Sequence, residues 1–208
     1  ILNTDDTHPA DFPPNTLNPL MGFLLELDKL KAVQRRNYIN HDGKAKTRFE
    51  NSAEHSWHLA MACWAIADLF RLNLNHERLL KMALVHDLGE IEAGDTFLFD
   101  TARANAYLAE RVGVEKLQHH AGNGIADLLV VWDEQENGNT PEAKLIKVVD
   151  RILPFLLNIN TSGGAWTDRG IKREQVEKAL AFIAVDFPPI HAWLVGEIEN
   201  SVQKNWLK

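Results

Sequence analysis

Apolar residues recur at helical spacing along most of this chain. Leu20, Leu24, Leu27 and Leu30 follow one another every three or four residues, which is typical of one face of an α-helix. The same period returns between turn signals, whereas strand-like alternation is nearly absent. The pattern predicts helices over residues 19–34, 53–72, 76–91, 101–119, 123–137, 141–159, 172–185 and 188–206. We therefore expect an all-α fold, built as a single-domain compact helical bundle.

The length and the first residues define the expected domain organisation. A chain of 208 residues corresponds best to one domain, since a domain has about 150 residues. Residues 1–18 are rich in Pro and Asp and lack the basic start and apolar run of a signal peptide. We expect them to form an extended N-terminal arm, followed by the helical domain over residues 19–208.

The charge balance narrows the range of partners. Asp and Glu total 29 against 22 Lys and Arg, a formal net charge of −7, and no block of basic residues interrupts the chain. Nucleic-acid polymers bind to clustered Lys and Arg that displace phosphate counterions, so we expect no such partner. One small phosphorylated ligand is still compatible with this charge, because a single Arg and a metal ion can hold it.

The apolar stretches and the cysteine content argue against a membrane protein or a secreted one. The longest apolar stretch, residues 59–70, contains Asp68 and is shorter than the roughly 20 residues that span a bilayer. The single cysteine, Cys63, lies in an apolar helical pattern and is expected in the core. One cysteine allows no disulfide within the chain, which favours a reducing compartment, and we expect a cytoplasmic protein.

Three predicted helices each place a titratable side chain on an apolar face. Each of these helices has a stripe of apolar residues at helical spacing. His55 lies one turn before the first stripe, Asp87 occupies a position of the second where an apolar residue would be expected, and Asp150 lies within the third. A lone inward His or Asp has an ordinary explanation as a hydrogen-bonded core residue, but three together indicate a common site. The stripes consist of Leu59, Cys63, Ile66, Phe70, Leu80, Leu84, Ile91, Ile146, Val149, Leu153 and Leu157.

Inward carboxylates with no basic residue on the same stripes indicate a bound cation. A buried carboxylate either takes up a proton or finds a positive charge. His86 precedes Asp87, and neighbours about 100° apart around a helix can flank one ion. Imidazole nitrogen with carboxylate oxygen suits Zn, Mn, Fe, Co or Mg. The residues therefore predict one divalent metal ion, while His58 is expected to hydrogen-bond nearby and His119-His120 to be solvated.

Two more acids follow the His-Asp pair. Glu90 comes four residues after His86 and so projects from the same helical face, where an acid or base could assist the metal. The alternative is a glutamate at the helix end that faces solvent. Gly94 permits a sharp turn after the helix, from which Asp95 can fold back toward the site.

These residues belong to an ordered series of motifs. The series consists of Glu54-His55-Ser56, His86-Asp87-Leu88-Gly89-Glu90-Ile91-Glu92-Ala93-Gly94-Asp95, Trp132-Asp133-Glu134, Pro141-Glu142-Ala143-Lys144 and Asp150. Over roughly residues 20–160 it resembles the HD-domain metal-dependent phosphohydrolases, and among them the small single-domain 5′-deoxynucleotidase branch. A bare His-Asp pair would be weak evidence, whereas its extension to Gly94-Asp95 makes the resemblance specific.

The resemblance implies a helical bundle of the HD-domain type and a role for each matching residue. The implied metal ligands are His55, His86, Asp87 and Asp150. Glu90 and Asp95 would assist catalysis, and Arg35 would bind the substrate phosphate through its planar fork of donors. This chain departs from its relatives where they place an aromatic residue near that arginine, since Arg36 follows directly and Tyr38 comes later. Base or sugar contacts are therefore expected to differ.

The expected activity is the metal-dependent hydrolysis of a deoxyribonucleoside 5′-monophosphate to deoxyribonucleoside and phosphate by a metal-activated water. Glu90 would orient or deprotonate this water, or protonate the leaving 5′-oxygen. The alternatives are a nucleoside triphosphate or cyclic-nucleotide phosphohydrolase, or a non-catalytic nucleotide-sensing module. A triphosphatase would need several more inward basic residues than we can nominate, and a degenerate module would usually lose metal ligands. The resemblance also implies a homodimer, for which Trp193 and Trp206 are candidate anchors.

Overall fold

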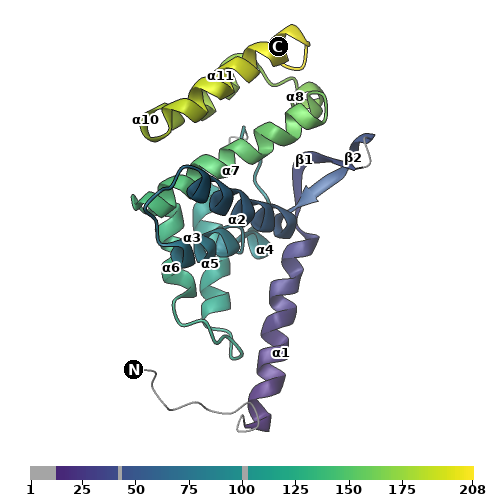
Figure 1. Ribbon diagram of the computed structural model, residues 1–208. Helices are drawn as coiled ribbons and strands as arrows, with labels where there is room; N and C mark the ends of the chain where they lie inside the picture. The colour runs from purple at the N-terminus through teal and green to yellow at the C-terminus, as the bar shows by residue number, and fades with distance from the viewer. Residues whose placement is uncertain (1–12, 42–43, 100–102) are drawn as a thin grey trace.

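Helices make up nearly all the regular structure of the chain. The computed structural model describes residues 13–41, 44–99 and 103–208. Within these residues the only sheet is a two-stranded hairpin, so the all-α prediction is confirmed (Figure 1). The elements are α1 Pro14–Asp28, the 3₁₀-helix η2 Lys29–Ala32, β1 Gln34–His41, β2 Lys44–Asn51, α2 Ser52–Leu69, α3 His76–Val85, α4 Glu90–Ala93, α5 Arg103–Gln118, α6 Leu128–Asn137, α7 Pro141–Asn160, α8 Gly164–Arg169, α9 Arg173–Leu180, α10 Ile183–Asp186 and α11 Pro188–Gln203.

The helix α7 separates two hydrophobic cores. Its residues Val149 and Leu153 pack into a core shared with α2, α3 and α6. Val148, Ile152 and Phe155 of the same helix pack into a second core with α8, α9 and α11. In Figure 1, α2 and α3 accordingly lie on one side of α7 and α11 on the other. Both faces of α7 are covered, and Asp150 in its middle turns is 6% exposed.

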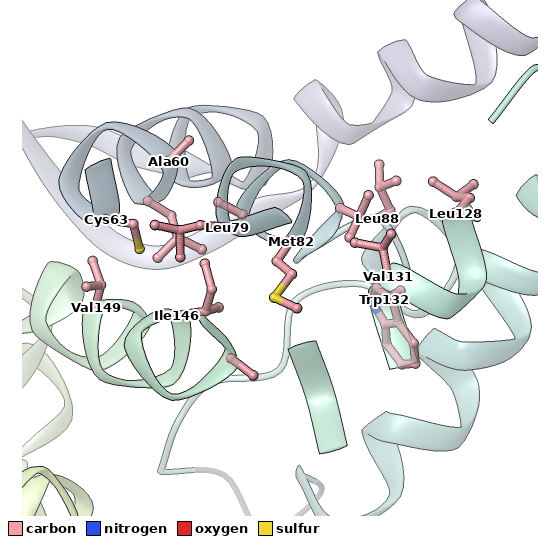
Figure 2. Close-up of a cluster of buried hydrophobic side chains, with 14 of the residues drawn as sticks. Ala60, Cys63, Leu79, Met82, Leu88, Leu128, Val131, Trp132, Ile146 and Val149 are labelled. Carbon is pink, nitrogen blue, oxygen red and sulfur yellow. The ribbon is translucent and has the colours of Figure 1, made fainter. Parts of the chain in front are cut away.

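The first core contains the single cysteine. Cys63 is fully buried, and burial raises the pKa of its thiol, so it is an unreactive packing residue as predicted. Figure 2 shows its side chain among those of α3 and α7. The labelled neighbours in that view are Ala60, Leu79, Met82, Ile146 and Val149.

The buried face of α3 differs from the predicted one. Leu79 and Met82 are fully buried, whereas Leu84, which belongs to the predicted stripe, is 57% exposed. The expected helix over residues 76–91 also stops at Val85, and the chain turns through residues 86–89 before α4. Asp87 is therefore directed inward by this turn and not by the helical stripe that we inferred.

The hairpin β1–β2 is the main element that the periodicity does not predict. Its strands pair antiparallel, with Gln34 opposite Asn51 and Tyr38 opposite Phe49, and the register is irregular between these pairs. Only a few apolar side chains occur among polar ones here, so the alternation typical of a half-buried strand is weak. Residues 42–43, between the two strands, lie outside the described residues. The expected helix over residues 19–34 therefore ends too late, since strand β1 already begins at Gln34.

Several helix boundaries also differ from the predicted ones. Helix α1 begins at Pro14, so residues 14–18 of the expected arm are helical, while residues 1–12 lie outside the described residues. The expected helix over residues 172–185 is divided into α9 and α10, and the short helix α8 was not predicted. The long helices α2, α5, α7 and α11 lie where the apolar period places them, with ends shifted by a few residues.

Among the described residues, no helix combines the length and the apolar character needed to cross a bilayer.

Candidate active site

The start of α2 determines the position of His55. Asn51 caps the helix, because its side-chain oxygen accepts a hydrogen bond from the Glu54 amide at 2.9 Å. In return the Asn51 amide donates to the Glu54 carboxylate at 3.1 Å, which completes a capping box. This cap ends the hairpin and begins the helix at one defined residue. His55, which follows in the first turn, is fully buried and faces α7.

The turn between α3 and α4 brings in the next group. His86 and Asp87 belong to this turn, and Glu90 is the first residue of α4. Gly89 lies so close to α5 that a Cβ there would be 2.6 Å from the backbone oxygen of Glu110. Only glycine fits this approach. The break in the helix thus lets α4 pack against α5 while three polar side chains enter the interior together.

Two histidines and one aspartate converge. His55 Nε2 lies 3.1 Å and His86 Nε2 3.2 Å from the same atom, Asp150 Oδ1. One ligand atom of each of these three residues lies within 4.8 Å of the others. Asp87 Oδ1 is 3.4 Å from His86 Nε2, so the fourth predicted ligand borders the same space. Residues from three segments of the chain, far apart in sequence, thus meet at one point.

The hydrogen bonds of His86 indicate what belongs at this point. Its Nδ1 donates to the side-chain oxygen of Gln135 at 2.9 Å, and the Gln135 amide donates to Glu136 at 2.8 Å, which fixes that oxygen toward the ring. A neutral imidazole protonated at Nδ1 presents a lone pair on Nε2. In this form the lone pair faces the Asp150 carboxylate at 3.2 Å, so either a proton on Nε2 or a metal cation lies between them. The donor set of imidazole nitrogens and carboxylate oxygens fits a divalent metal of the Zn, Mn, Fe or Co type.

Arg35 lies among the acids of the site. It is 8% exposed, and its Nη1 donates to Asp87 Oδ2 at 2.8 Å. Burial acts to lower its pKa, but the surrounding carboxylates, above all Asp87 and Glu90, raise the pKa of Arg35 above its ordinary value. The guanidinium therefore stays charged. The further carboxylates within 4.0 Å of it are those of Glu50, Glu90, Asp95 and Asp150.

Glu90 is a buried acid with an altered proton affinity. It is 7% exposed, and Ser52 Oγ donates to its Oε2 at 2.5 Å. Burial and the nearby Asp87 raise the pKa of Glu90 to about 9, although Arg35 and Ser52 act in the opposite direction. A divalent cation in the neighbouring site would counteract this rise, because it favours the charged form. The proton affinity of Glu90 therefore depends on whether the neighbouring site holds a cation.

Asp95 follows the end of α4. Gly94 has a φ of 75°, which favours glycine, and it reverses the chain after the helix. The turn brings Asp95 back, as predicted, so that its Oδ1 lies 4.0 Å from Arg35 Nη1 with the side chain 7% exposed. All seven residues singled out from the sequence therefore meet around one space.

Comparisons with known proteins identify the family. The profile of a family described as an HD domain matches residues 27–190, which include every residue of the site. The chain belongs to the HD-domain family of metal-dependent phosphohydrolases. The family resemblance inferred from the motifs is confirmed. A crystal structure of a predicted metal-dependent phosphohydrolase from Magnetospirillum magnetotacticum is similar to this HD-domain chain with a TM-score of 0.79 and 32% identity, covering 94% of this chain and 97% of that one.

Two curated relatives carry a more specific name. The 5′-deoxynucleotidase HDDC2 of Danio rerio is 28% identical over 138 residues, which are 65% of this HD-domain chain and 66% of that protein. The 5′-deoxynucleotidase YfbR of Salmonella newport is 25% identical over 187 residues, or 81% of this chain and 92% of that protein. The match thus spans just under two thirds of the first relative and most of the second.

The site borders a cavity of the HD domain that is lined by side chains of two kinds. Arg35, His86, Asp87, Glu90, Asp95 and Asp150 of the site contribute charged groups. The segments α7, α8, α9 and the loop after α4 contribute apolar and aromatic side chains. These apolar residues are Phe97, Leu98, Phe99, Pro154, Phe155, Trp166, Val176, Ala179 and Leu180.

Sequence inspection missed the residues that support this site. Gln135 is 1% exposed and orients His86, and fully buried Ser52 binds Glu90, yet neither lies in a pattern that distinguishes it from ordinary polar residues. Their roles depend on contacts between segments that only the fold brings together. Of the histidines set aside, His58 is not part of the cluster found among the described residues, and His119 binds a backbone oxygen at the end of α5.

Proposed function

We propose that this chain holds one divalent metal ion at His55, His86, Asp87 and Asp150 and hydrolyses deoxyribonucleoside 5′-monophosphates to deoxyribonucleoside and phosphate. The supporting observation is the convergence of both histidine Nε2 atoms on one oxygen of Asp150, which lines a cavity together with the buried Arg35. When bound, such an ion lowers the pKa of water and offsets the charge of phosphoryl oxygens. The chain's own residues account for the rest of the chemistry.

Arg35 binds the phosphate in this proposal. Its guanidinium offers a rigid fork of donors that matches two phosphate oxygens. Its present partner at 2.8 Å is Asp87, itself a proposed metal ligand. A cation at Asp87 and a phosphate at Arg35 would each replace one half of this pair, so neither charge is left unpaired in the interior. Binding of the substrate and of the ion is therefore coupled through Arg35.

Glu90 transfers protons in this proposal, and Asp95 binds a hydroxyl group or water. The oxygen of a water molecule bonds to phosphorus while the bond between phosphorus and the 5′-oxygen breaks. Glu90, a buried acid 7% exposed, gives a proton to the departing 5′-oxygen and recovers one from the attacking water. Asp95 accepts a hydrogen bond from that water or from the sugar hydroxyl.

The leaving group is proposed to be a nucleoside. Phe97, Phe155 and Trp166 line the same cavity as the charged residues of the site. An aromatic base buries apolar surface in such a place, which a small polar alcohol would not do. Arg36 also lines the cavity, whereas Tyr38 stacks on Phe49 within the hairpin. The names of the two curated relatives support the same substrate class.

A panel of substrates tests this proposal. The purified protein is freed of metal with a chelator, supplied in turn with Mn, Co, Mg or Zn, and incubated with nucleoside and deoxynucleoside mono- and triphosphates and with cyclic nucleotides. We expect orthophosphate from deoxynucleoside 5′-monophosphates in the presence of metal. Release of inorganic triphosphate from nucleoside triphosphates, or opening of cyclic nucleotides in preference to both, would assign the site to one of the alternative activities. Nucleotide binding without any hydrolysis would indicate a sensing module.

We further propose that the protein forms a homodimer. On α2 the side chains of Trp57, Met61 and Trp64 recur at helical spacing and are 65%, 45% and 45% exposed, so together they form an apolar patch. Of the two candidate anchors, Trp193 is 48% exposed and Trp206 is partly buried. Light scattering after gel filtration should give twice the chain mass, and Trp64→Glu should shift it toward the monomer. A monomeric wild-type protein would refute the dimer.

The cytoplasm is the proposed location. Cys63, the single cysteine, is buried in the first core and forms no disulfide. A chain of this kind suits a reducing compartment. Fractionation of cells that express a tagged chain would check this, and recovery from an exported fraction would contradict it.

A further inference from the structure

Glu50 lies behind the site and has no part in the proposed chemistry. It is the second-last residue of β2, and it is 3% exposed although it carries a carboxylate. Its Oε2 lies 3.4 Å from His55 Nδ1 and 3.5 Å from Arg35 Nε. Glu50 thus borders one proposed metal ligand and the proposed phosphate-binding residue, and it is not among the residues that line the cavity.

The three facing atoms are all unsatisfied. Glu50 Oε2, His55 Nδ1 and Arg35 Nε are buried and form no hydrogen bond of normal geometry. An unpaired buried polar group costs about 1–3 kcal/mol. Arg35 Nε–H is a donor, His55 Nδ1–H is a donor in one tautomer, and a carboxylate oxygen can accept from both. Alignment of both N–H groups with Glu50 Oε2 would therefore satisfy all three groups at once.

A hydrogen bond at this position decides which nitrogen of His55 faces the site. If Nδ1 carries the proton and donates to Glu50, the unprotonated Nε2 is directed at Asp150 Oδ1, 3.1 Å away, where the ion is proposed to bind. Gln135 does the same for His86, whose Nδ1 donates to it at 2.9 Å. Outer partners of this kind orient ligating imidazoles and increase their basicity. Glu50 differs from Gln135 in that it carries a charge and also reaches the arginine.

We propose that Glu50 is a positioning residue, which holds His55 with Nε2 toward the metal and holds the guanidinium of Arg35 toward the phosphate. The proposal rests on the function proposed above, since it presupposes that His55 binds the ion. In this proposal the hairpin has a defined role, because pairing of Gln34 with Asn51 brings the neighbouring residues Arg35 and Glu50 together at the base of the strands. The strands thereby couple the metal ligand to the phosphate-binding residue.

Two substitutions and a control test this role. Glu50→Ala removes the acceptor, whereas Glu50→Gln retains an oxygen that can accept from His55 but loses the charge. The control is Glu54→Gln, which removes a carboxylate four residues away that pairs with Arg48 at the surface. Glutamine also supports the capping box at this position. Zn²⁺ affinity is measured by competition with a chromogenic chelator, and the tautomer of His55 by the ¹⁵N shifts of its ring in the Zn²⁺-bound protein.

Glu50→Ala should weaken Zn²⁺ binding by about 100-fold and Glu50→Gln by about tenfold, the range measured for outer partners of metal ligands. Glu54→Gln should change it less than about twofold. The Nδ1 resonance of His55 should move in both Glu50 variants, which a merely structural role would not cause. The KM for the phosphate substrate should also rise, because Arg35 loses its support.

The outcomes separate this proposal from the one it rests on. Wild-type protein that binds no Zn²⁺ at His55 would overturn the metal site and the role of Glu50 together. Wild-type protein that binds Zn²⁺ normally, with both Glu50 variants within about twofold of it and with unchanged His55 shifts, would overturn the role of Glu50 alone. If Glu50→Ala does not fold, the affinity and ring shifts of Glu50→Gln decide the question by the same criterion.

Discussion

Arg35→Ala is expected to destabilise the protein strongly, and divalent metal is expected to compensate. The substitution removes a guanidinium that is 8% exposed, bonded to Asp87 at 2.8 Å and surrounded by four more carboxylates. Removing one partner of a buried ion pair costs about 3–5 kcal/mol, because the other charge is left uncompensated. An unfolding entropy of about 2.1 cal/mol/K per residue, over 208 residues, converts this loss into a fall in Tm of about 7–11 °C.

Thermal unfolding monitored by circular dichroism, with chelator and then with excess Mn²⁺, measures both effects. Arg36→Ala is the matched control, because this neighbouring arginine is exposed and its loss should cost less than about 1 kcal/mol. Added metal supplies positive charge to the acids that Arg35 leaves behind, so it should raise the Tm of Arg35→Ala by more than that of wild type. If Arg35→Ala and Arg36→Ala melt together in chelator, and metal stabilises both equally, the electrostatic account of the site is wrong.

Three further predictions concern catalysis, pH and packing. Glu90→Gln should retain bound metal but lower kcat by about 10²–10⁴-fold, as expected for loss of a proton donor. The exposed control Glu92→Gln should leave kcat unchanged. Normal turnover of metal-loaded Glu90→Gln would exclude the role of Glu90 in proton transfer. Burial opposes the charged form of His86, but Asp87 and Asp150 raise its pKa to about 10, so its ring must lose a proton before an ion binds. Metal affinity should therefore rise by about tenfold per pH unit through the neutral range in calorimetric titrations, and an affinity independent of pH would contradict this assignment. Leu79→Ala, at a fully buried position in the first core, should lower the free energy of unfolding by about 2–5 kcal/mol in urea titrations, and a loss below about 1 kcal/mol would show that the core rearranges to fill the space.

The helical part of the fold could be predicted because its signal is local. Helices α2, α5, α7 and α11 each have apolar side chains at the period of a helix and are bounded by turn residues, so no tertiary information is needed to place them. The hairpin could not be predicted in this way. Its apolar residues Tyr38 and Phe49 form a pair across the strands, which a pattern along one strand does not reveal.

The site could be predicted in its residues but not in its geometry. His55 and Asp150 lie on helical stripes, and the structure places both in the interior. Asp87 also lies in the interior, but the predicted reason, a place on the stripe of a continuous helix, is wrong. Helix α3 ends at Val85, and the close contact of Gly89 with α5 belongs to the turn that follows. That contact joins segments far apart in sequence. The supporting residue Gln135 could not be predicted for the same reason, because only its contact with His86 distinguishes it from other glutamines of the chain.

The central claim is that phosphate-ester hydrolysis requires one divalent ion held by His55, His86, Asp87 and Asp150. The most direct test titrates chelator-treated protein with Mn²⁺ or Co²⁺ while bound metal and phosphate release from a deoxynucleoside 5′-monophosphate are measured on the same sample. We expect one ion per chain, with activity proportional to occupancy, and with both lost in Asp150→Asn. Activity that persists without bound metal, or full metal binding by Asp150→Asn, would contradict the account.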